Sequence, residues 1–206
     1  MIRSYCCMCL LCVVLSACVS TSVADSTPTL EIHPTLTIQN AVPIQPLGQQ
    51  QERSDFGKFF QEAGIEGVFV LYDLNQDTYL VYNPKRVDIP YLPASTFKIF
   101  NSLVALETGV IKDENEIILW DGVNRGVVEW NRDLNMRLAI QYSAVWFYQE
   151  LARRIGQERM QQYIDQVGYG NGDIGGGIDH FWLDGDLRIT ARQEVEFLLR
   201  LYRNDL

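Results

Sequence analysis

Histidine, long apolar runs and runs of positive charge are scarce in this sequence, and each scarcity excludes a class of function. Histidine occurs only at His33 and His180, so a Ser-His-Asp triad and a zinc-dependent hydrolase both lack their usual side chains. The formal net charge is -9 and no run of lysine and arginine forms a phosphate-binding stripe, which argues against a nucleic-acid partner. The apolar run over residues 5–15 is too short to span a bilayer comfortably.

Cysteine is confined to the amino terminus of the chain. The five cysteines are Cys6, Cys7, Cys9, Cys12 and Cys18. A folded domain that follows them therefore has no disulfide. An exported domain without a disulfide must rest on its hydrophobic core, so we expect a domain of fair size.

The first eighteen residues have the pattern of an export signal. Arg3 precedes the apolar run, which ends in Leu-Ser-Ala-Cys at residues 15–18. That ending resembles the lipobox of bacterial lipoproteins, whose cysteine is acylated. We therefore predict a signal peptide over residues 1–17 and a lipid anchor on Cys18, which would tether the protein to a bacterial membrane on the periplasmic side. The alternative is an ordinary signal peptide and a soluble periplasmic protein.

The rest of the chain divides into a linker and one domain. Residues 18–51 are rich in threonine, serine, proline and glutamine, which predicts a flexible linker. Residues 52–206 carry the periodic patterns of an α+β domain with helices packed on an antiparallel sheet. We predict a helix that ends at Gly64 and a hairpin formed by residues 67–72 and 78–82. We predict four further helices, over residues 95–109, 138–155, 157–167 and 191–203. A hairpin alone is too small a sheet, so we expect carboxy-terminal strands that this sequence lacks.

The strongest chemical signal is the tetrapeptide Ser95-Thr96-Phe97-Lys98. On a helix, this spacing places the serine hydroxyl and the lysine amine on one face. Lysine can take the proton of a serine nucleophile only if burial lowers its pKa, and the apolar neighbours favour that. The same four residues could instead be an N-cap serine followed by a solvated lysine, because Ser-x-x-Lys alone is a weak signal.

The surrounding residues resemble the penicillin-recognising serine enzymes, and among them the class D β-lactamases or oxacillinases. The resemblance covers about residues 52–206. It rests on four stretches in the family order, which are PASTFK at 93–98, WDG at 120–122, QYSAV at 141–145, and YGN at 169–171 with GGIDHFWLDG at 176–185.

The resemblance implies a substrate, an activity and a set of site residues. The substrate would be a small-molecule β-lactam, hydrolysed with the effect of antibiotic resistance. Ser95 would form the acyl-enzyme, and Lys98 would react with carbon dioxide to give an N-carboxylated base. Ser143 would pass a proton to the leaving nitrogen, Val145 would keep the base dry, and Trp182 would hold the carbamate. No metal and no cofactor other than carbon dioxide or bicarbonate is implied.

One motif of the family is not found. The Lys-Thr/Ser-Gly strand, which supplies one donor of the oxyanion hole, is absent from the sequence, and we interpret this as a carboxy-terminal truncation. Three other functions stay open on this evidence, namely a non-hydrolytic penicillin-binding sensor, a transpeptidase and an inactive remnant. The sequence indicates neither the range of β-lactams nor an oligomeric state.

Overall fold

The computed structural model describes residues 48–206. The predicted signal peptide, the lipid anchor on Cys18 and most of the predicted linker lie outside the described residues. Within the described range, no helix combines the length and the apolar character needed to cross a membrane.

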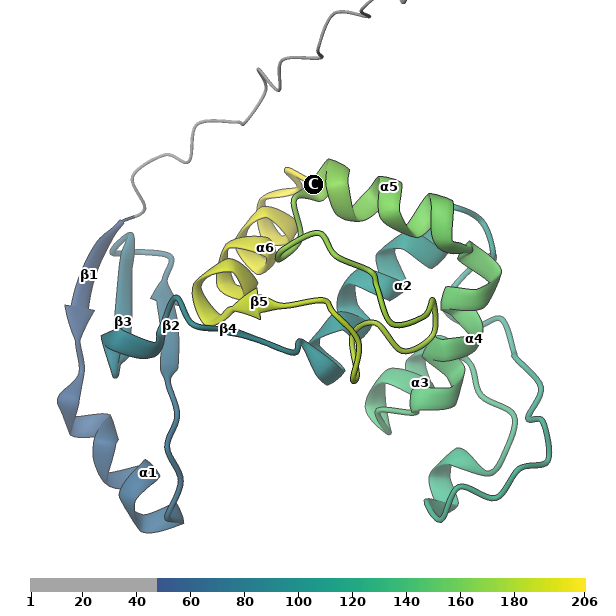
Figure 1. Cartoon of the computed structure of the whole chain (residues 1–206), viewed down its shortest axis with the longest axis horizontal. Helices are drawn as coiled ribbons and strands as arrows, with labels where there is room; N and C mark the ends of the chain where they lie inside the picture. Colours follow the sequence, from purple (N-terminus) through teal and green to yellow (C-terminus); the bar gives the residue numbers. More distant parts are fainter. Residues whose placement is uncertain (1–47) are drawn as a thin grey trace, which may run out of the picture. The chain divides into compact units, whose positions relative to one another are not determined.

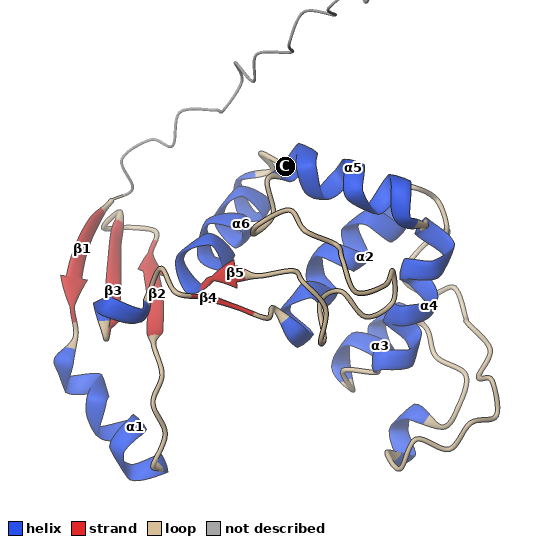
Figure 2. Cartoon of the chain, viewed as in Figure 1, coloured by secondary structure: helices blue, strands red, loops and turns tan. Residues whose placement is uncertain are grey.

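A three-stranded sheet lies at the amino-terminal end of the described chain (Figures 1 and 2). Its strands are β1 (Gln49–Glu52), β2 (Phe69–Asp73) and β3 (Thr78–Tyr82), in the spatial order β1-β3-β2. Strands β2 and β3 pair antiparallel, which confirms the predicted hairpin. The Asp73 carboxylate closes the hairpin turn by accepting the backbone N–H groups of Asn75 and Gln76.

Strand β1 corrects two predictions. It begins at Gln49, inside the segment assigned to the linker, and it pairs parallel to β3, so the sheet is mixed rather than antiparallel. All four residues of β1 are exposed and polar. It is held by backbone pairing to β3 and by a hydrogen bond from Arg192 to the Gln50 side chain. Such a strand leaves no apolar alternation in the sequence, so pattern analysis could not detect it.

Six α-helices lie in the part of the chain that the structure describes. They are α1 (Gly57–Ala63), α2 (Phe97–Glu107), α3 (Met136–Gln141), α4 (Val145–Ile155), α5 (Gln157–Val167) and α6 (Ala191–Arg203). The predicted ends at Gly64 and Gly168 are confirmed, since both glycines adopt the left-handed conformation that closes a helix. A small antiparallel pair, β4 (Pro90–Tyr91) and β5 (Ile189–Thr190), joins segments far apart in the sequence.

The predicted helix over 138–155 is wrong in one respect, because the chain breaks at 142–144 into α3 and α4. At the break, Ser143 has a φ angle of 51°, which no α-helix accommodates. Apolar periodicity continues across the break, and for this reason the sequence pattern concealed it.

Helix α2 runs through the main hydrophobic core. Phe97 and Phe100 on α2 pack with aromatic side chains from other elements, among them Tyr169, Phe181 and Trp182. A smaller cluster covers the sheet and consists of Tyr79, Val81 and Val87 with partly buried neighbours. Helix α6 packs against both clusters. Its Phe197 faces the main core, while Val195 and Leu199, four residues apart, face the cluster on the sheet.

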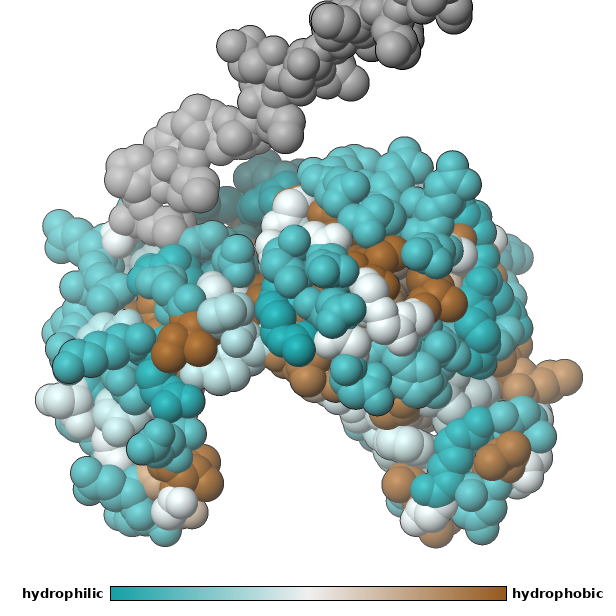
Figure 3. Space-filling model, in the orientation of Figure 1, coloured by the Kyte–Doolittle hydropathy of each residue, from teal (hydrophilic) through white to brown (hydrophobic). Residues whose placement is uncertain are grey.

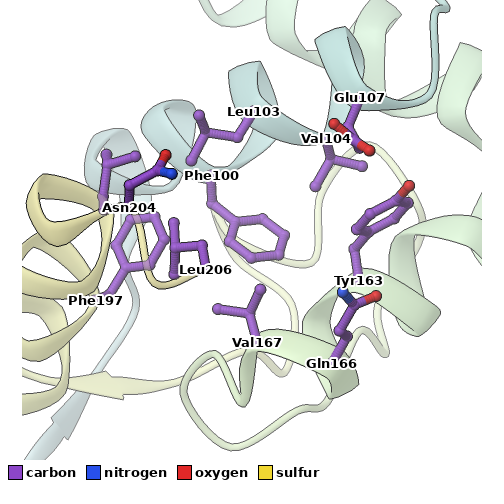
Figure 4. A pocket seen from close by; sticks show the side chains of 11 residues that line it. Phe100, Leu103, Val104, Glu107, Tyr163, Gln166, Val167, Phe197, Asn204 and Leu206 are labelled. Carbon is purple, nitrogen blue, oxygen red and sulfur yellow. The ribbon is translucent and has the colours of Figure 1, made fainter.

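An apolar groove of about 320 Å³ lies along the carboxy-terminal part of α2 (Figure 4). Phe100, Val104, Val167 and Phe197 form its apolar floor, and Glu107 lies at its rim. None of the residues that line the groove belongs to the Ser95 turn or to the Ser143 turn. The groove is therefore separate from the predicted chemistry.

Candidate active site

Ser95 lies in a 3-10 turn, Ala94–Thr96, that leads directly into α2. Two hydrogen bonds across the turn stabilise it, because Thr96 donates its N–H and its hydroxyl to the Pro93 carbonyl, at 3.1 and 2.9 Å. Ala94 holds a φ angle of 47°, and its N–H donates to the Trp182 carbonyl at 2.9 Å. A non-glycine residue in that region is costly, so these contacts are what keep the nucleophile at a fixed position.

Lys98 lies directly behind Ser95. Residues three apart eclipse each other where a 3-10 turn passes into a helix, and the Lys98 Nζ donates to the Ser95 Oγ at 2.8 Å. The lysine is only 2% exposed, so the alternative of a solvated lysine is wrong. Burial lowers its pKa, because a desolvated ammonium is disfavoured relative to the neutral amine. A neutral amine beside a serine hydroxyl can act as its base.

Ser143 meets Ser95 from the turn between α3 and α4. The two hydroxyl oxygens are 3.1 Å apart, although the residues are 48 positions apart in the sequence. The unusual backbone of Ser143 is supported by hydrogen bonds from the N–H groups of Ser143 and Ala144 to the end of α3. The structure therefore brings Ser95, Lys98 and Ser143 into one hydrogen-bonded chain, in which a proton can pass along the two hydroxyls to or from the amine.

Val145 and Trp182 occupy less direct positions. Val145 is half-buried and begins α4, two residues after Ser143. Trp182 is fully buried and stacks on Phe97 with their ring centroids 5.2 Å apart, and its carbonyl holds the Ala94 N–H. Trp182 thus supports the Ser95 turn from behind through both its ring and its backbone.

The sequence analysis missed Tyr148, which forms the wall of the lysine site on α4. The Lys98 Nζ lies 5.7 Å from the centre of the Tyr148 ring. The Tyr148 hydroxyl lies 3.1 Å from the Ser102 Oγ, which donates to the Lys98 carbonyl at 2.8 Å, and Asn101 donates to the Tyr148 carbonyl at 3.0 Å. No sequence signal marks Tyr148, because its role depends on how α2 and α4 cross.

Trp130 was also missed, and it fixes the Ser143 turn. Its indole N–H donates to the Tyr142 carbonyl at 2.8 Å, and its own carbonyl accepts the indole N–H of Trp146 at 2.8 Å. The loop 117–130 that leads to it exposes apolar side chains, including Leu119 at 74% and Val128 at 80%, and Figure 3 shows apolar surface over this region at the lower right. This loop therefore presents apolar surface and reaches the Ser143 turn through Trp130.

The Tyr-Gly-Asn stretch at residues 169–171 shapes the backbone beneath the site. Asn171 bonds to Arg188 and Asp186 through its side chain, at 3.0 Å in each case. Gly170 has a φ angle of 61°, and a Cβ atom there would lie 2.2 Å from the Arg188 carbonyl oxygen, so only glycine fits. The Tyr169 hydroxyl donates to Glu194 on α6 at 2.9 Å.

Comparisons with known proteins identify the family of this chain. The sequence matches the penicillin binding protein transpeptidase domain over residues 67–205. The β-lactamase OXA-48 of Klebsiella pneumoniae is 47% identical over 156 residues, which are 76% of this chain and 59% of that protein. The chain thus spans about three fifths of the length of the curated relatives it matches first.

Two solved structures resemble the fold. The class D β-lactamase YbXI from Nostoc has 53% sequence identity and a TM-score of 0.71, with 73% of this chain and 64% of that chain covered. The C-terminal domain of the Bacillus licheniformis BlaR penicillin-receptor has 34% identity and a TM-score of 0.74, with 78% and 65% covered. The chain therefore belongs to the penicillin binding protein transpeptidase family, and within that family it is homologous to the class D β-lactamases.

Proposed function

We propose that this chain carries the acylation site of a class D β-lactamase, which hydrolyses the β-lactam ring of penicillin-type antibiotics and confers resistance to them. The observation that supports this most directly is the chain of three side chains, with Lys98 Nζ at 2.8 Å and Ser143 Oγ at 3.1 Å from Ser95 Oγ. Identity of 47% with a β-lactamase supports the same reaction.

The proposed reaction has two halves, acylation of Ser95 and hydrolysis of the acyl-enzyme, and the base at Lys98 acts in both. Ser95 Oγ attacks the lactam carbonyl while its proton passes to the base at Lys98. The lactam C–N bond then breaks, and Ser143 passes a proton to the leaving nitrogen, which leaves an ester on Ser95. A water molecule attacks the ester with the help of the same base, and the penicilloic acid leaves with Ser95 restored.

We further propose that Lys98 works as an N-carboxylated lysine. A neutral amine combines with carbon dioxide to give a carbamate and a proton, and a carbamate supplies an anionic base that a protonated lysine cannot. The lowered pKa of Lys98 supports this, because only the unprotonated amine reacts. The Tyr148 ring supplies apolar surroundings for the carbamate, and we propose that Val145 helps to keep it dry.

Mass spectrometry after exposure to benzylpenicillin tests the proposal. We expect a covalent adduct on the native protein and none on Ser95→Ala. In buffer freed of bicarbonate, turnover should fall and should return when bicarbonate is restored. Adduct formation by Ser95→Ala would contradict the role of Ser95, and turnover that is indifferent to bicarbonate would contradict carboxylation alone.

A penicillin-binding sensor is the second candidate function, and the similarity to the BlaR receptor domain supports it. A sensor stops at the acyl-enzyme, whereas a β-lactamase hydrolyses it. The lifetime of the adduct therefore separates the two: an adduct that lasts for hours indicates a sensor, and one that is lost during turnover indicates an enzyme. No adduct on a correctly folded chain would indicate an inactive remnant.

We also propose that the protein is exported to the periplasm and held at a membrane by an acylated Cys18. The support is the Leu-Ser-Ala-Cys ending of the predicted signal peptide. Fractionation of cells that express Cys18→Ser tests it, with the expected shift from the membrane fraction to the soluble periplasmic fraction. Equal distribution of both forms would contradict the anchor.

A further inference from the structure

Asn101 places a buried amide in the interface between α2 and α4. It is fully buried, and apart from Lys98 and Ser102 the other buried side chains of α2 are apolar. Its Nδ2 donates to the Tyr148 carbonyl on α4 at 3.0 Å, while its Oδ1 is buried and has no hydrogen-bond partner among the described residues. A half-satisfied amide in an apolar interface lowers stability, so stability does not explain why an amide is there.

The hydrogen bond of Asn101 joins the two elements that carry the reactive side chains. Asn101 follows Lys98 by three residues, so the two lie on one face of α2. Its acceptor, Tyr148, lies in the first turn of α4, five residues after Ser143. The bond therefore connects the helix that carries Lys98 to the start of the helix that follows Ser143.

The contact between the two serines needs such a connection. The Ser95 and Ser143 hydroxyl oxygens are 3.1 Å apart, and a slide of α4 along α2 by about 1 Å would take them beyond hydrogen-bond distance. Apolar packing is not directional and resists such a slide only weakly. In packed helices of coiled coils, one buried asparagine fixes the register of the two helices at a cost in stability.

Ser102 also contacts Tyr148, but it is less suited to fix the register. Its hydroxyl meets the Tyr148 hydroxyl at 3.1 Å, at the end of a side chain. Asn101 instead meets a backbone carbonyl, whose position the helix itself determines. The bond from Asn101 is therefore the one that reports and restrains the position of α4 as a whole.

We propose that Asn101 is a positioning residue for the reaction, which fixes the register of α4 against α2 and so holds the Ser143 hydroxyl at the Ser95 hydroxyl. It acts through the backbone of α4 and takes no part in bond making or proton transfer. The effect on acylation rests on the proposed function, whereas the effect on the Ser143 turn does not.

The first experiment measures acylation by a fluorescent penicillin in the native protein, Asn101→Leu and Asn101→Ala. Leucine keeps the branched outline of asparagine and alanine leaves a cavity, but both remove the donor. We expect the acylation rate constant to fall in both variants, by up to about 10²-fold, with the dissociation constant of the complex that precedes acylation unchanged. Urea unfolding should show that Asn101→Ala is the less stable of the two. An acylation rate that follows stability, kept in Asn101→Leu and lost in Asn101→Ala, would overturn the proposal.

Val104→Ala is the matched control on the same helix. Val104 is buried three residues after Asn101 and lines the apolar groove that is separate from the site. The variant should unfold at a lower urea concentration and be acylated at the native rate. A loss of rate equal to that in Asn101→Leu would overturn the proposal, because damage to the packing of α2 would then be a sufficient cause.

A double-mutant cycle with Ser143→Ala tests the route of the effect. If Asn101 acts by placing the Ser143 hydroxyl, its substitution has nothing left to misplace once that hydroxyl is removed. We expect Asn101→Leu to slow the residual acylation of Ser143→Ala by less than about 2-fold. Losses that multiply, so that the double variant shows the product of the two single effects, would overturn the proposal.

The last measurement needs no penicillin. In NMR spectra, the backbone amide resonance of Ser143 should move in Asn101→Leu and stay at its native position in Val104→Ala. A Ser143 resonance that is unchanged in Asn101→Leu would overturn the proposal. If the native protein is not acylated at all, the proposed function fails, while this measurement still decides whether Asn101 sets the position of the Ser143 turn.

Discussion

The core around α2 and the cluster on the sheet differ in how they are held together. The first joins α2 to α3, α4, α5 and α6 through many buried side chains, including a stack of aromatic rings. The second has three fully buried residues and depends on α6 for cover. Strand β2 also leaves Phe69 and Leu71, which are outside this cluster, 41% and 42% exposed. All the catalytic candidates lie in or beside the first core, so the reactive residues are attached to the better packed region.

The largest loss of stability should follow Phe97→Ala. Phe97 is fully buried and packs on Phe100, Tyr169, Phe181 and Trp182. Loss of such a ring costs about 3–5 kcal/mol. Urea unfolding should show this decrease. A decrease in the free energy of unfolding that is smaller than the decrease in Val81→Ala, on the sheet, would contradict the comparison between the two regions.

Val81→Ala tests the sheet cluster. Val81 is fully buried on β3, but its cluster is small and can collapse around a lost side chain more easily. We expect a cost of about 1–2 kcal/mol in the same urea experiment, since most single substitutions fall near that range. If Val81→Ala lowered the free energy of unfolding as much as Phe97→Ala, the two regions would be equally sensitive to the loss of a buried side chain.

Lys98→Met should separate stability from chemistry. Removal of a buried amine relieves its desolvation, with a gain on the order of 1–3 kcal/mol at neutral pH, while acylation should be lost. The pKa of Lys98 is lowered in the folded state, so the native protein loses stability as pH falls from the ordinary value of 10.5 to the lowered pKa, and the loss is complete below that pKa. Thermal unfolding of both proteins at several pH values should therefore show that Lys98→Met is more stable than the native protein, by a difference that decreases toward alkaline pH. A constant gain would contradict burial of a titrating amine.

Tyr148→Phe should have the smallest effect. It removes the hydroxyl beside Ser102 but keeps the ring over Lys98, and Ser102 retains its bond to the Lys98 carbonyl. We expect a loss of about 0.5–1.5 kcal/mol in unfolding and little change in acylation rate. Tyr148→Leu removes the ring as well, and a loss of acylation confined to that variant would assign the role to the aromatic wall. Equal losses in both variants would assign it to the hydroxyl.

Pattern analysis predicted the elements that have a buried face or a glycine end. The hairpin, α5 and α6 and the ends at Gly64 and Gly168 all have one of these signals. It failed at β1, whose exposed polar residues have no signal, and at Ser143, where the apolar pattern runs across the break. In the site, Ser95 and Lys98 were predicted from their spacing together with the family resemblance, whereas Tyr148 and Trp130 depend on contacts between elements remote in sequence.

The sequence by itself determined that Ser95 and Lys98 lie three residues apart, a spacing that lets hydroxyl and amine share one face of a helix. It also determined the likeness to class D β-lactamases, through four short stretches in order. Only the tertiary structure decided that Lys98 is buried, that Ser143 reaches Ser95, and that the Tyr148 ring lies beside Lys98. Burial and contact across 48 or more positions depend on how helices cross, and local sequence does not encode that crossing.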